Sequence, residues 1–141
     1  MGKRLLLEVT LLDDLHTGTG GSAGQIDAVQ AVDKYGSPII RGTHIRGVLR
    51  AMADELENLQ EERYKDLAIE LFGSDKHGVR GPVMVQSLYW KEGPEHWSKV
   101  WSSTSRENDA EHLSRSAKED TLRVVEFVAA GTVFSGEIFL H

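Results

Sequence analysis

The sequence predicts a single α+β domain. Three observations predict it: the length of 141 residues is that of one domain, apolar runs of strand length lie at both ends of the chain, and one long stretch between them has helical periodicity. Hydrophobic residues make up 40% and charged residues 27% of the chain, so it can build one core beneath a solvated surface. We expect this domain to span residues 1–141.

The first element is a strand. Residues 4–12 form an apolar run rich in Leu and Val that ends in a polar cluster, which is typical of a buried strand. A glycine-rich stretch follows over residues 15–40. It is too long for a plain connection, and loops of this length in compact domains are usually functional or disordered.

Two helical segments come next. From Thr43, the expected N-cap, apolar residues recur at three- and four-residue steps over 43–59, as in an amphipathic helix. A second, shorter helical segment is predicted for 64–72, ended by Gly73.

Three more strands are predicted in the second half. Apolar runs occupy 83–90, 122–129 and 133–140, and the turn Ala130-Gly131-Thr132 joins the last two, so we expect these two to pair as a hairpin. Residues 91–121 are polar and low in apolar content, and we expect them to protrude from the core.

Composition excludes several classes of protein. With 16 basic and 22 acidic residues the net charge is −6, which argues against a globally basic nucleic-acid binder. The net charge does not exclude a local basic surface, because salt confines charge attraction to about 8 Å. The absence of cysteine excludes disulfide scaffolds, cysteine nucleophiles and thiolate zinc sites. No run approaches the roughly 18 apolar residues of a membrane span, and no secretory leader is recognisable, so we expect a cytoplasmic protein without membrane contact.

The glycine-rich stretch matches neither common nucleotide-binding pattern. A P-loop needs Lys and a hydroxyl residue directly after its last glycine, whereas Gln25 and Ile26 follow Gly24. A dinucleotide fingerprint needs G-x-G-x-x-G directly between strand and helix, and the glycines of residues 18–24 have another spacing.

Three stretches together carry a family resemblance: HTGTGGS at 16–22, QID at 25–27 and SPIIRGTHIRGVLR at 37–50. They resemble the RAMP superfamily of CRISPR effector proteins, in particular the backbone subunits of type III complexes. The helix start is the specific part of the pattern. The resemblance continues through LFG at 71–73 to AAGTVF at 129–134, and so covers nearly the whole chain.

The resemblance implies a ferredoxin-like, RNA-recognition-type RAMP domain with a glycine-rich loop and a β-hairpin thumb. Such a domain would assemble along a CRISPR guide RNA with neighbouring RAMP subunits and other type III effector subunits, and would meet the target RNA. By position, 91–121 is the thumb, with Arg106 and Arg115 within reach of RNA. The chain ends after 133–140, so we expect it to lack the last helix and strand of the usual ferredoxin-like unit.

The helix start is the predicted guide-binding surface. A helix N-terminus favours phosphate, arginine forks add charge-assisted hydrogen bonds, and Arg46 and Arg50 share a face because they are four residues apart. From the residues alone, solvated arginines that pair with Asp54 or Glu57 are the alternative. The resemblance implies RNA contact by Gly20, Gly21, Ser22, Arg41, Thr43, His44, Arg46 and Arg50.

Asp27 is the candidate catalytic residue, since it occupies the position at which related type III subunits carry the carboxylate required for target-RNA cleavage. That chemistry needs a divalent cation, Mg²⁺ or Mn²⁺, beside the phosphodiester. A solvated loop aspartate is the alternative. Asp33, which opens the turn Asp33-Lys-Tyr-Gly36, is assigned to structure. We name no metal ligands, because the histidines show no metal-ligand spacing.

Three functions stay open, and with them whether the protein is an enzyme. The first is a guide-binding backbone subunit that cleaves guide-paired target RNA as a metal-dependent endoribonuclease. The second is a non-catalytic structural subunit or fragment that assembles on RNA. The third is a metal-independent guide-processing ribonuclease centred on His16, although a lone histidine more often only forms a hydrogen bond. Trp97 and Trp101 can stack on bases, but packing together or beneath the thumb is the more usual role.

Overall fold

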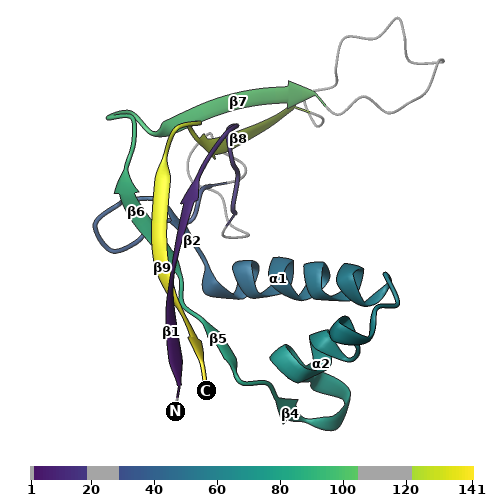
Figure 1. Cartoon of the computed structure of the whole chain (residues 1–141). Coiled ribbons are helices and arrows are strands. Elements are labelled where there is room, and N and C mark those ends of the chain that lie inside the picture. The colour runs from purple at the N-terminus through teal and green to yellow at the C-terminus, as the bar shows by residue number, and fades with distance from the viewer. Residues whose placement is uncertain (1, 19–28, 105–121) are drawn as a thin grey trace, which may run out of the picture. The chain divides into compact units, whose positions relative to one another are not determined.

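A computed structural model of the chain describes residues 2–18, 29–104 and 122–141 (Figure 1). It is a mixed α/β structure with antiparallel sheets, which confirms the predicted class at that level. The described residues fall into two compact units. The described residues of the first unit lie within Met1–Val9, Ile39–Tyr89 and Phe134–His141, and those of the second lie within Thr10–Pro38 and Trp90–Val133.

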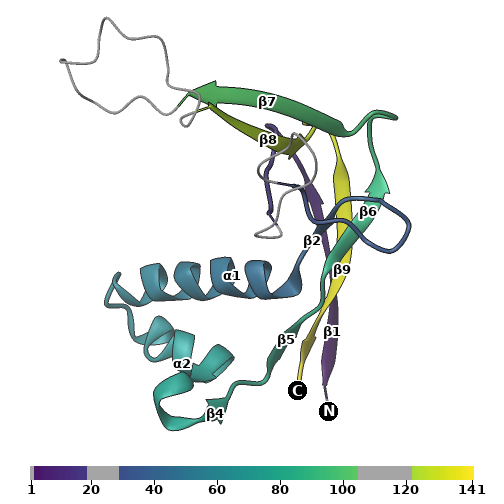
Figure 2. The same cartoon turned by 180° about the vertical axis from the view of Figure 1, so that it is seen from behind.

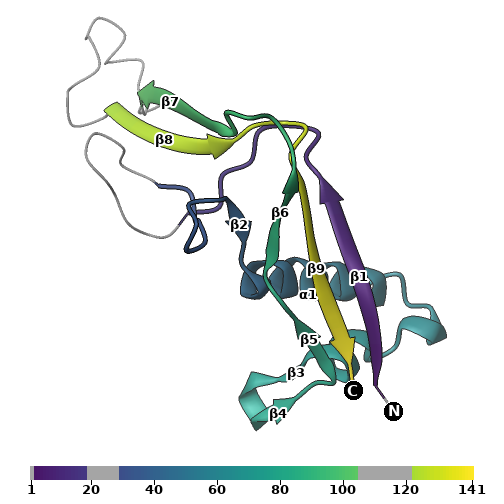
Figure 3. The same cartoon turned by 90° about the vertical axis from the view of Figure 1, so that its left-hand side faces the viewer.

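The first unit is built on one sheet, in which β1 lies at an edge and runs antiparallel to β9 (Figure 3). In spatial order the strands are β1 (Lys3–Thr10), β9 (Val133–Leu140), β6 (Leu88–Glu92) and β2 (Ile39–Ile40), with β5 (Val83–Val85) also paired to β9. Ile40 faces Leu88 across the β2–β6 pair. Leu88 and Phe134 are fully buried, so this sheet supplies much of the unit's core.

Two helices pack against each other in the same unit (Figure 2). The elements are α1 (Gly42–Glu57), the 3-10 turn η1 (Glu62–Tyr64), α2 (Leu67–Phe72), β3 (Gly73–Ser74), η2 (Asp75–His77) and β4 (Val79–Arg80). Their core contains Ala53, Ala68 and Phe72, with Leu49 and Val83 packed around it. Of the apolar residues that predicted α1, Leu49 meets this core, whereas Val48 and Met52 are exposed.

The predicted helix boundaries need small corrections. Arg41, with an extended backbone, is the N-cap of α1, so Thr43 lies inside the helix. The helix predicted over 64–72 begins only at Leu67, because Tyr64 ends η1, the backbone leaves the helical region at Lys65 and it turns left-handed at Asp66, with φ of 55°. Gly73 ends α2 as predicted, since its φ of +77° is unfavourable for any residue with a Cβ.

The second unit contains a pair of long antiparallel strands, β7 (Ser98–Thr104) and β8 (Leu122–Val128). The register runs from Ser98 opposite Val128 to Thr104 opposite Leu122. The chain segment that follows β1 lies beside the end of this pair: Leu15 bridges to Val128, and Leu11 exchanges backbone hydrogen bonds with Thr132 and Gly131. Val128 is fully buried in this unit.

The expected hairpin between 122–129 and 133–140 is wrong. Both segments are strands and a turn joins them, with φ of +89° at Gly131, but β8 pairs with β7 while β9 belongs to the sheet of the first unit. The prediction missed β7, because the polar residues of SKVWSST resemble a loop by composition. The interval 91–121 therefore contains part of a regular strand pair.

None of the described helices is both long enough and apolar enough to cross a membrane.

Candidate nucleic-acid interface

The start of α1 is fixed against the connection between β5 and β6. The N–H of Gly42 donates to the hydroxyl of Ser87 at 3.1 Å. A Cβ at Gly42 would meet the backbone of Val85 and Gln86, so only glycine allows this close approach. The first turn of α1 therefore has a defined position on the first unit.

Most N–H groups of this first turn are already used. The N–H groups of His44 and Ile45 both donate to the carbonyl oxygen of Arg41, at 3.0 and 3.2 Å, and that of Gly42 donates to Ser87. Among the described residues the N–H of Thr43 has no such partner, and the Thr43 side chain is exposed. The turn carries no acidic residue. Phosphate binding here would thus depend on Thr43 and on neighbouring cations more than on a full set of free amides.

The three arginines of the motif have different surroundings. Arg41 is exposed and Arg50 half-buried, and neither forms an ion pair with a described residue. Arg46 is engaged within the protein: its Nη2 donates to the carbonyl oxygen of Phe72 at 2.6 Å, and its guanidinium lies 5.5 Å from the centre of the Phe72 ring.

Among the described residues, neither Arg46 nor Arg50 forms the alternative ion pair with Asp54 or Glu57. The carboxylate of Glu57 instead accepts the N–H of Ala68 at 2.7 Å, which satisfies a free amide at the start of α2. On α1 and its N-cap, the predicted surface thus has four residues whose side chains form no hydrogen bond or ion pair with a described residue: Arg41, Thr43, His44 and Arg50. Of these, Arg41, Thr43 and His44 are exposed.

The other predicted site residues lie outside the described residues: Gly20, Gly21, Ser22, Asp27, Arg106 and Arg115. The structure does describe both ends of the glycine-rich stretch, where Gly18 bridges to Gln30 in antiparallel fashion. The turn at Asp33 is confirmed, because its carboxylate accepts the N–H groups of Tyr35 at 2.8 Å and Ser37 at 3.0 Å.

His16 has two contacts in the second unit. Its Nδ1–H donates to the carbonyl oxygen of Glu126 at 2.6 Å, and its ring meets the ring of Phe127 edge-on at 5.8 Å. These contacts are those of a histidine that packs and hydrogen-bonds. Trp101 on β7 keeps 58% of its surface exposed, which leaves its ring accessible to a base, whereas Trp97 is half-buried.

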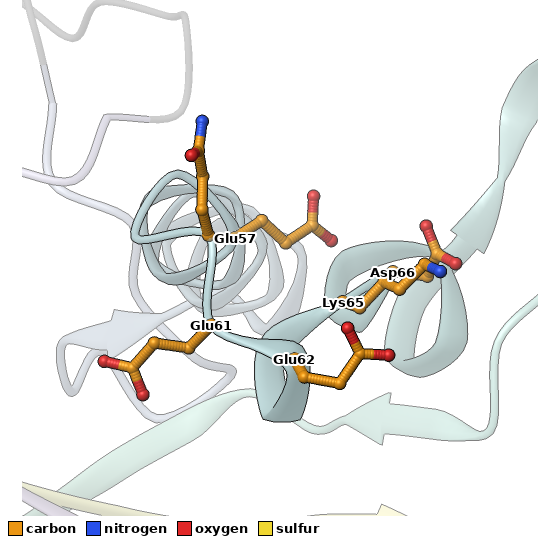
Figure 4. Close-up of a pocket in the computed structure, with 6 residues that line it drawn as sticks. Glu57, Glu61, Glu62, Lys65 and Asp66 are labelled. Carbon is orange, nitrogen blue, oxygen red and sulfur yellow. The ribbon is translucent and has the colours of Figure 1, made fainter.

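A pocket of about 300 Å³ lies beside the end of α1, and its lining is acidic (Figure 4). The lining residues are Glu57, Gln60, Glu61, Glu62, Lys65 and Asp66. Four carboxylates face a single ammonium group, so the charge of the pocket is unfavourable for phosphate. Within the described ranges, no three or more His, Asp or Glu side chains are grouped so as to hold a metal ion.

Sequence reasoning missed two residues that organise the second unit, Gln30 and Glu126. Gln30 is fully buried, and its N–H donates to the Glu126 carboxylate at 2.9 Å. A signal was present, since Gln30 is the one polar residue within the apolar run AVQAV. A polar side chain inside such a run is buried only where it has hydrogen-bond partners.

Comparison with known proteins places this geometry in a family. A search of the curated proteins found no match. Among solved structures, a chain in the cryo-EM structure of the Type III-B Cmr-beta bound to cognate target RNA has the same fold, with a TM-score of 0.74 and 16% sequence identity. The match covers 99% of this chain and 46% of that one, so this chain spans less than half the length of its structural relative.

The family model of the RAMP superfamily matches residues 8–139, which is nearly the entire sequence and includes the glycine-rich stretch and α1. On this match, the chain belongs to the RAMP superfamily.

Proposed function

We propose that this protein is an RNA-binding subunit of a type III CRISPR effector complex. The observation that carries the proposal is the RAMP family match over residues 8–139. The fold shared with a chain of a Cmr complex bound to target RNA supports it. The partners would be guide RNA, target RNA, neighbouring RAMP subunits and further subunits of the same cytoplasmic ribonucleoprotein.

We also assign the first unit to the ferredoxin-like class. Its first strand, β1, lies next to β9 and not next to β6, and α1 comes between the first and second long strands in sequence. Among the described residues β1 has a strand partner on one side only, which leaves the edge where a fourth strand would pair. In the second unit, the β7–β8 pair is our candidate for the base of the thumb.

Guide RNA would be held along the first half of α1 by charge. Arg41 and Arg50 supply guanidinium groups, and Thr43 supplies an N–H and a hydroxyl. Contacts of this kind recognise phosphate and fix the position of the strand, while base pairing between guide and target reads the sequence. This division suits a subunit that must accept guides of any sequence.

For target cleavage we propose Asp27 as the carboxylate that binds Mg²⁺ or Mn²⁺ together with RNA. A bound divalent cation supplies Lewis-acid stabilisation of the charge that develops on the phosphate. Two described carboxylates of the second unit are already occupied by donors of the protein: Asp33 by the N–H groups of its turn, and Glu126 by Gln30 and Ser98.

The test is a cleavage assay on guide-paired target RNA, with Mg²⁺ and with EDTA. We expect cuts with Mg²⁺ only, their loss in Asp27→Ala with RNA binding retained, and unchanged cuts in the control Asp33→Asn. Retained cleavage in Asp27→Ala removes the catalytic assignment. Failure of the protein to bind guide RNA overturns the proposed function.

The same assay separates the two other functions. Guide protection without cuts under any divalent cation identifies a non-catalytic structural subunit. Cleavage of repeat RNA in EDTA that is lost in His16→Ala identifies a guide-processing ribonuclease. The contacts of His16 with Glu126 and Phe127 make us expect that His16→Ala alters stability and not RNA processing.

A further inference from the structure

The free edge of β1 is long, and its middle is apolar. β1 has β9 on one side and, among the described residues, no strand on the other (Figure 3). Half of the backbone N–H and C=O groups of such a strand face away from its partner, so the edge offers a row of donors and acceptors to another strand. Proteins commonly protect such edges with very short strands, prolines or charged side chains. β1 has eight residues, none of them proline, and its charges lie only towards its two ends.

The middle of β1 consists of three leucines. Leu5 keeps 56% and Leu6 keeps 71% of its surface exposed, whereas Leu7 is half-buried. Successive side chains of a strand point to opposite faces, so Leu6 lies on one face of the sheet and Leu5 and Leu7 lie on the other. Both faces therefore have exposed apolar surface at this edge.

The charged residues are placed symmetrically around Leu6. Arg4 lies two residues before it and Glu8 two residues after it, so all three side chains share one face. When two copies of β1 pair antiparallel with Leu6 opposite Leu6, Arg4 of each copy lies opposite Glu8 of the other, and Leu5 lies opposite Leu7. Directly opposite residues have Cβ atoms about 4.5–5.5 Å apart, and opposite charges at such positions stabilise a strand pair.

Neighbouring registers lack this match. A shift by two residues in either direction places Arg4 opposite an uncharged residue, Leu6 or Thr10. A shift by one residue places Arg4 opposite an apolar residue, Leu7 or Val9, and joins one face of the first sheet to the other face of the second. The register centred on Leu6 is therefore the one that keeps the faces aligned and gives Arg4 a carboxylate.

The contact that Arg4 already makes leaves it available for this pairing. Its Nη1 lies 3.5 Å from Oε1 of Glu137, and the Arg4 side chain keeps 70% of its surface exposed. So exposed an ion pair contributes little to stability, and a guanidinium group has several donors. Arg4 can therefore contact Glu137 and the carboxylate of a second copy together.

We propose that β1 is a dimerisation edge, at which β1 of a second copy pairs antiparallel across a two-fold axis at Leu6. The two sheets then form one continuous sheet, and the second copy occupies the place of the fourth strand. The interface is isologous, because each copy contributes the same residues. A single strand pair is a small interface, so we expect a reversible dimer with a Kd of roughly micromolar order.

The first test is sedimentation equilibrium of the full chain without RNA, over a range of protein concentrations and at about 0.15 M salt, where distant charges are screened. We expect a monomer–dimer equilibrium. Arg4→Glu and Glu8→Arg each place like charges opposite each other twice in the dimer, and each should raise its Kd by about tenfold. The double variant that combines them restores opposite charges and should recover most of this loss.

Lys3→Glu is the matched control for Arg4→Glu. It changes the net charge by the same amount, but Lys3 lies opposite Val9 in the proposed register. Its Kd should stay within about twofold of that of the unmodified protein.

The second test reads the register by disulfide formation. The chain has no cysteine, so a single introduced cysteine can be linked only to that of another copy. Leu6→Cys brings two thiols opposite each other, with Cα atoms about 5.5 Å apart or less, which suits a disulfide. Leu5→Cys leaves the two Cα atoms more than about 7 Å apart, which does not. Under mild oxidation we expect a linked dimer from Leu6→Cys, while Leu5→Cys stays largely monomeric.

A monomer at every concentration overturns the proposal, and so does a dimer that Arg4→Glu and Glu8→Arg leave unchanged. Equal cross-linking of Leu5→Cys and Leu6→Cys overturns it as well. Circular dichroism shows whether each variant is folded, and if the charge variants are not, the two cysteine variants decide. No measurement involves RNA, so failure of the dimer is distinguishable from failure of the proposed function.

Discussion

Arg46 donates a hydrogen bond from its guanidinium to the carbonyl oxygen of Phe72 at 2.6 Å, and the same guanidinium lies over the Phe72 ring. Phe72 is the last residue of α2, where carbonyl groups lack helical partners and carry partial negative charge. A residue that the motif predicts to contact RNA thus joins α1 to the end of α2. The effect of an Arg46 substitution on stability must therefore be measured separately from its effect on RNA binding.

Arg46→Ala should lower the free energy of unfolding by about 1–2 kcal/mol, because it removes a charge-assisted hydrogen bond and a ring contact from a half-buried site. Arg50→Ala should change it by less than about 0.5 kcal/mol, since Arg50 has no ion pair among the described residues. Urea denaturation of both variants measures the difference. Equal values for the two would mean that the Phe72 contact contributes nothing to stability.

Arg41→Ala and Arg50→Ala should each weaken RNA binding and flatten its salt dependence. Each lost phosphate contact with a single strand reduces the slope of log K against log salt by about 0.7. Filter binding over a range of salt concentrations measures the slope. Arg63→Ala is the control, because Arg63 pairs with Glu61 at 2.7 Å and lies over Tyr64. A similar change of slope in Arg63→Ala would show that the effect is one of net charge alone.

Gly42→Ala and Gly47→Ala should have opposite effects on stability, although both glycines lie in α1. A Cβ at Gly42 would meet the backbone of Val85 and Gln86, so we expect a loss of about 1–3 kcal/mol. A Cβ at Gly47 meets no atom within 4 Å, so helix propensity should add about 0.5–1 kcal/mol. Thermal and chemical unfolding of the two variants measure both changes in stability. Stabilisation by Gly42→Ala would contradict the placement of α1 on the β5–β6 connection.

Asp14 should make stability depend on pH in the acid range. The N–H of Ala130, which donates to Asp14 at 2.8 Å, lowers the pKa of this carboxyl, and Lys99 at 3.4 Å lowers it further. Since the pKa is lower in the folded state than in the unfolded one, the stabilisation is complete above the unfolded value and is lost as pH falls through the folded value.

The difference in melting temperature between the unmodified protein and Asp14→Asn should therefore be largest near neutral pH and shrink below a pH of about 4. Asp13→Asn, at an exposed neighbouring position, serves as the control. A difference that stays constant down to strongly acid pH would show that the carboxylate charge of Asp14 is not what matters.

The sequence by itself determined those features that depend on neighbouring residues. The apolar spacing of α1, the stop at Gly73, the turn at Asp33 and the strands at both ends of the chain follow from side-chain periodicity and from backbone angles open to glycine. The motif over 37–50 also predicted the RAMP family, which the match over 8–139 shows.

Only the tertiary structure decided which distant groups meet. That β8 pairs with β7 and not with β9, that Arg46 serves the end of α2, and that Gln30 joins Thr17 to Glu126 are all contacts between residues far apart in the chain. A strand presents the same backbone donors and acceptors to any partner strand. The sequence shows which side chains are polar, but it does not show which groups they will hydrogen-bond. Periodicity therefore indicates which polar groups need hydrogen-bond partners, while the packing of the whole unit decides which partners they have.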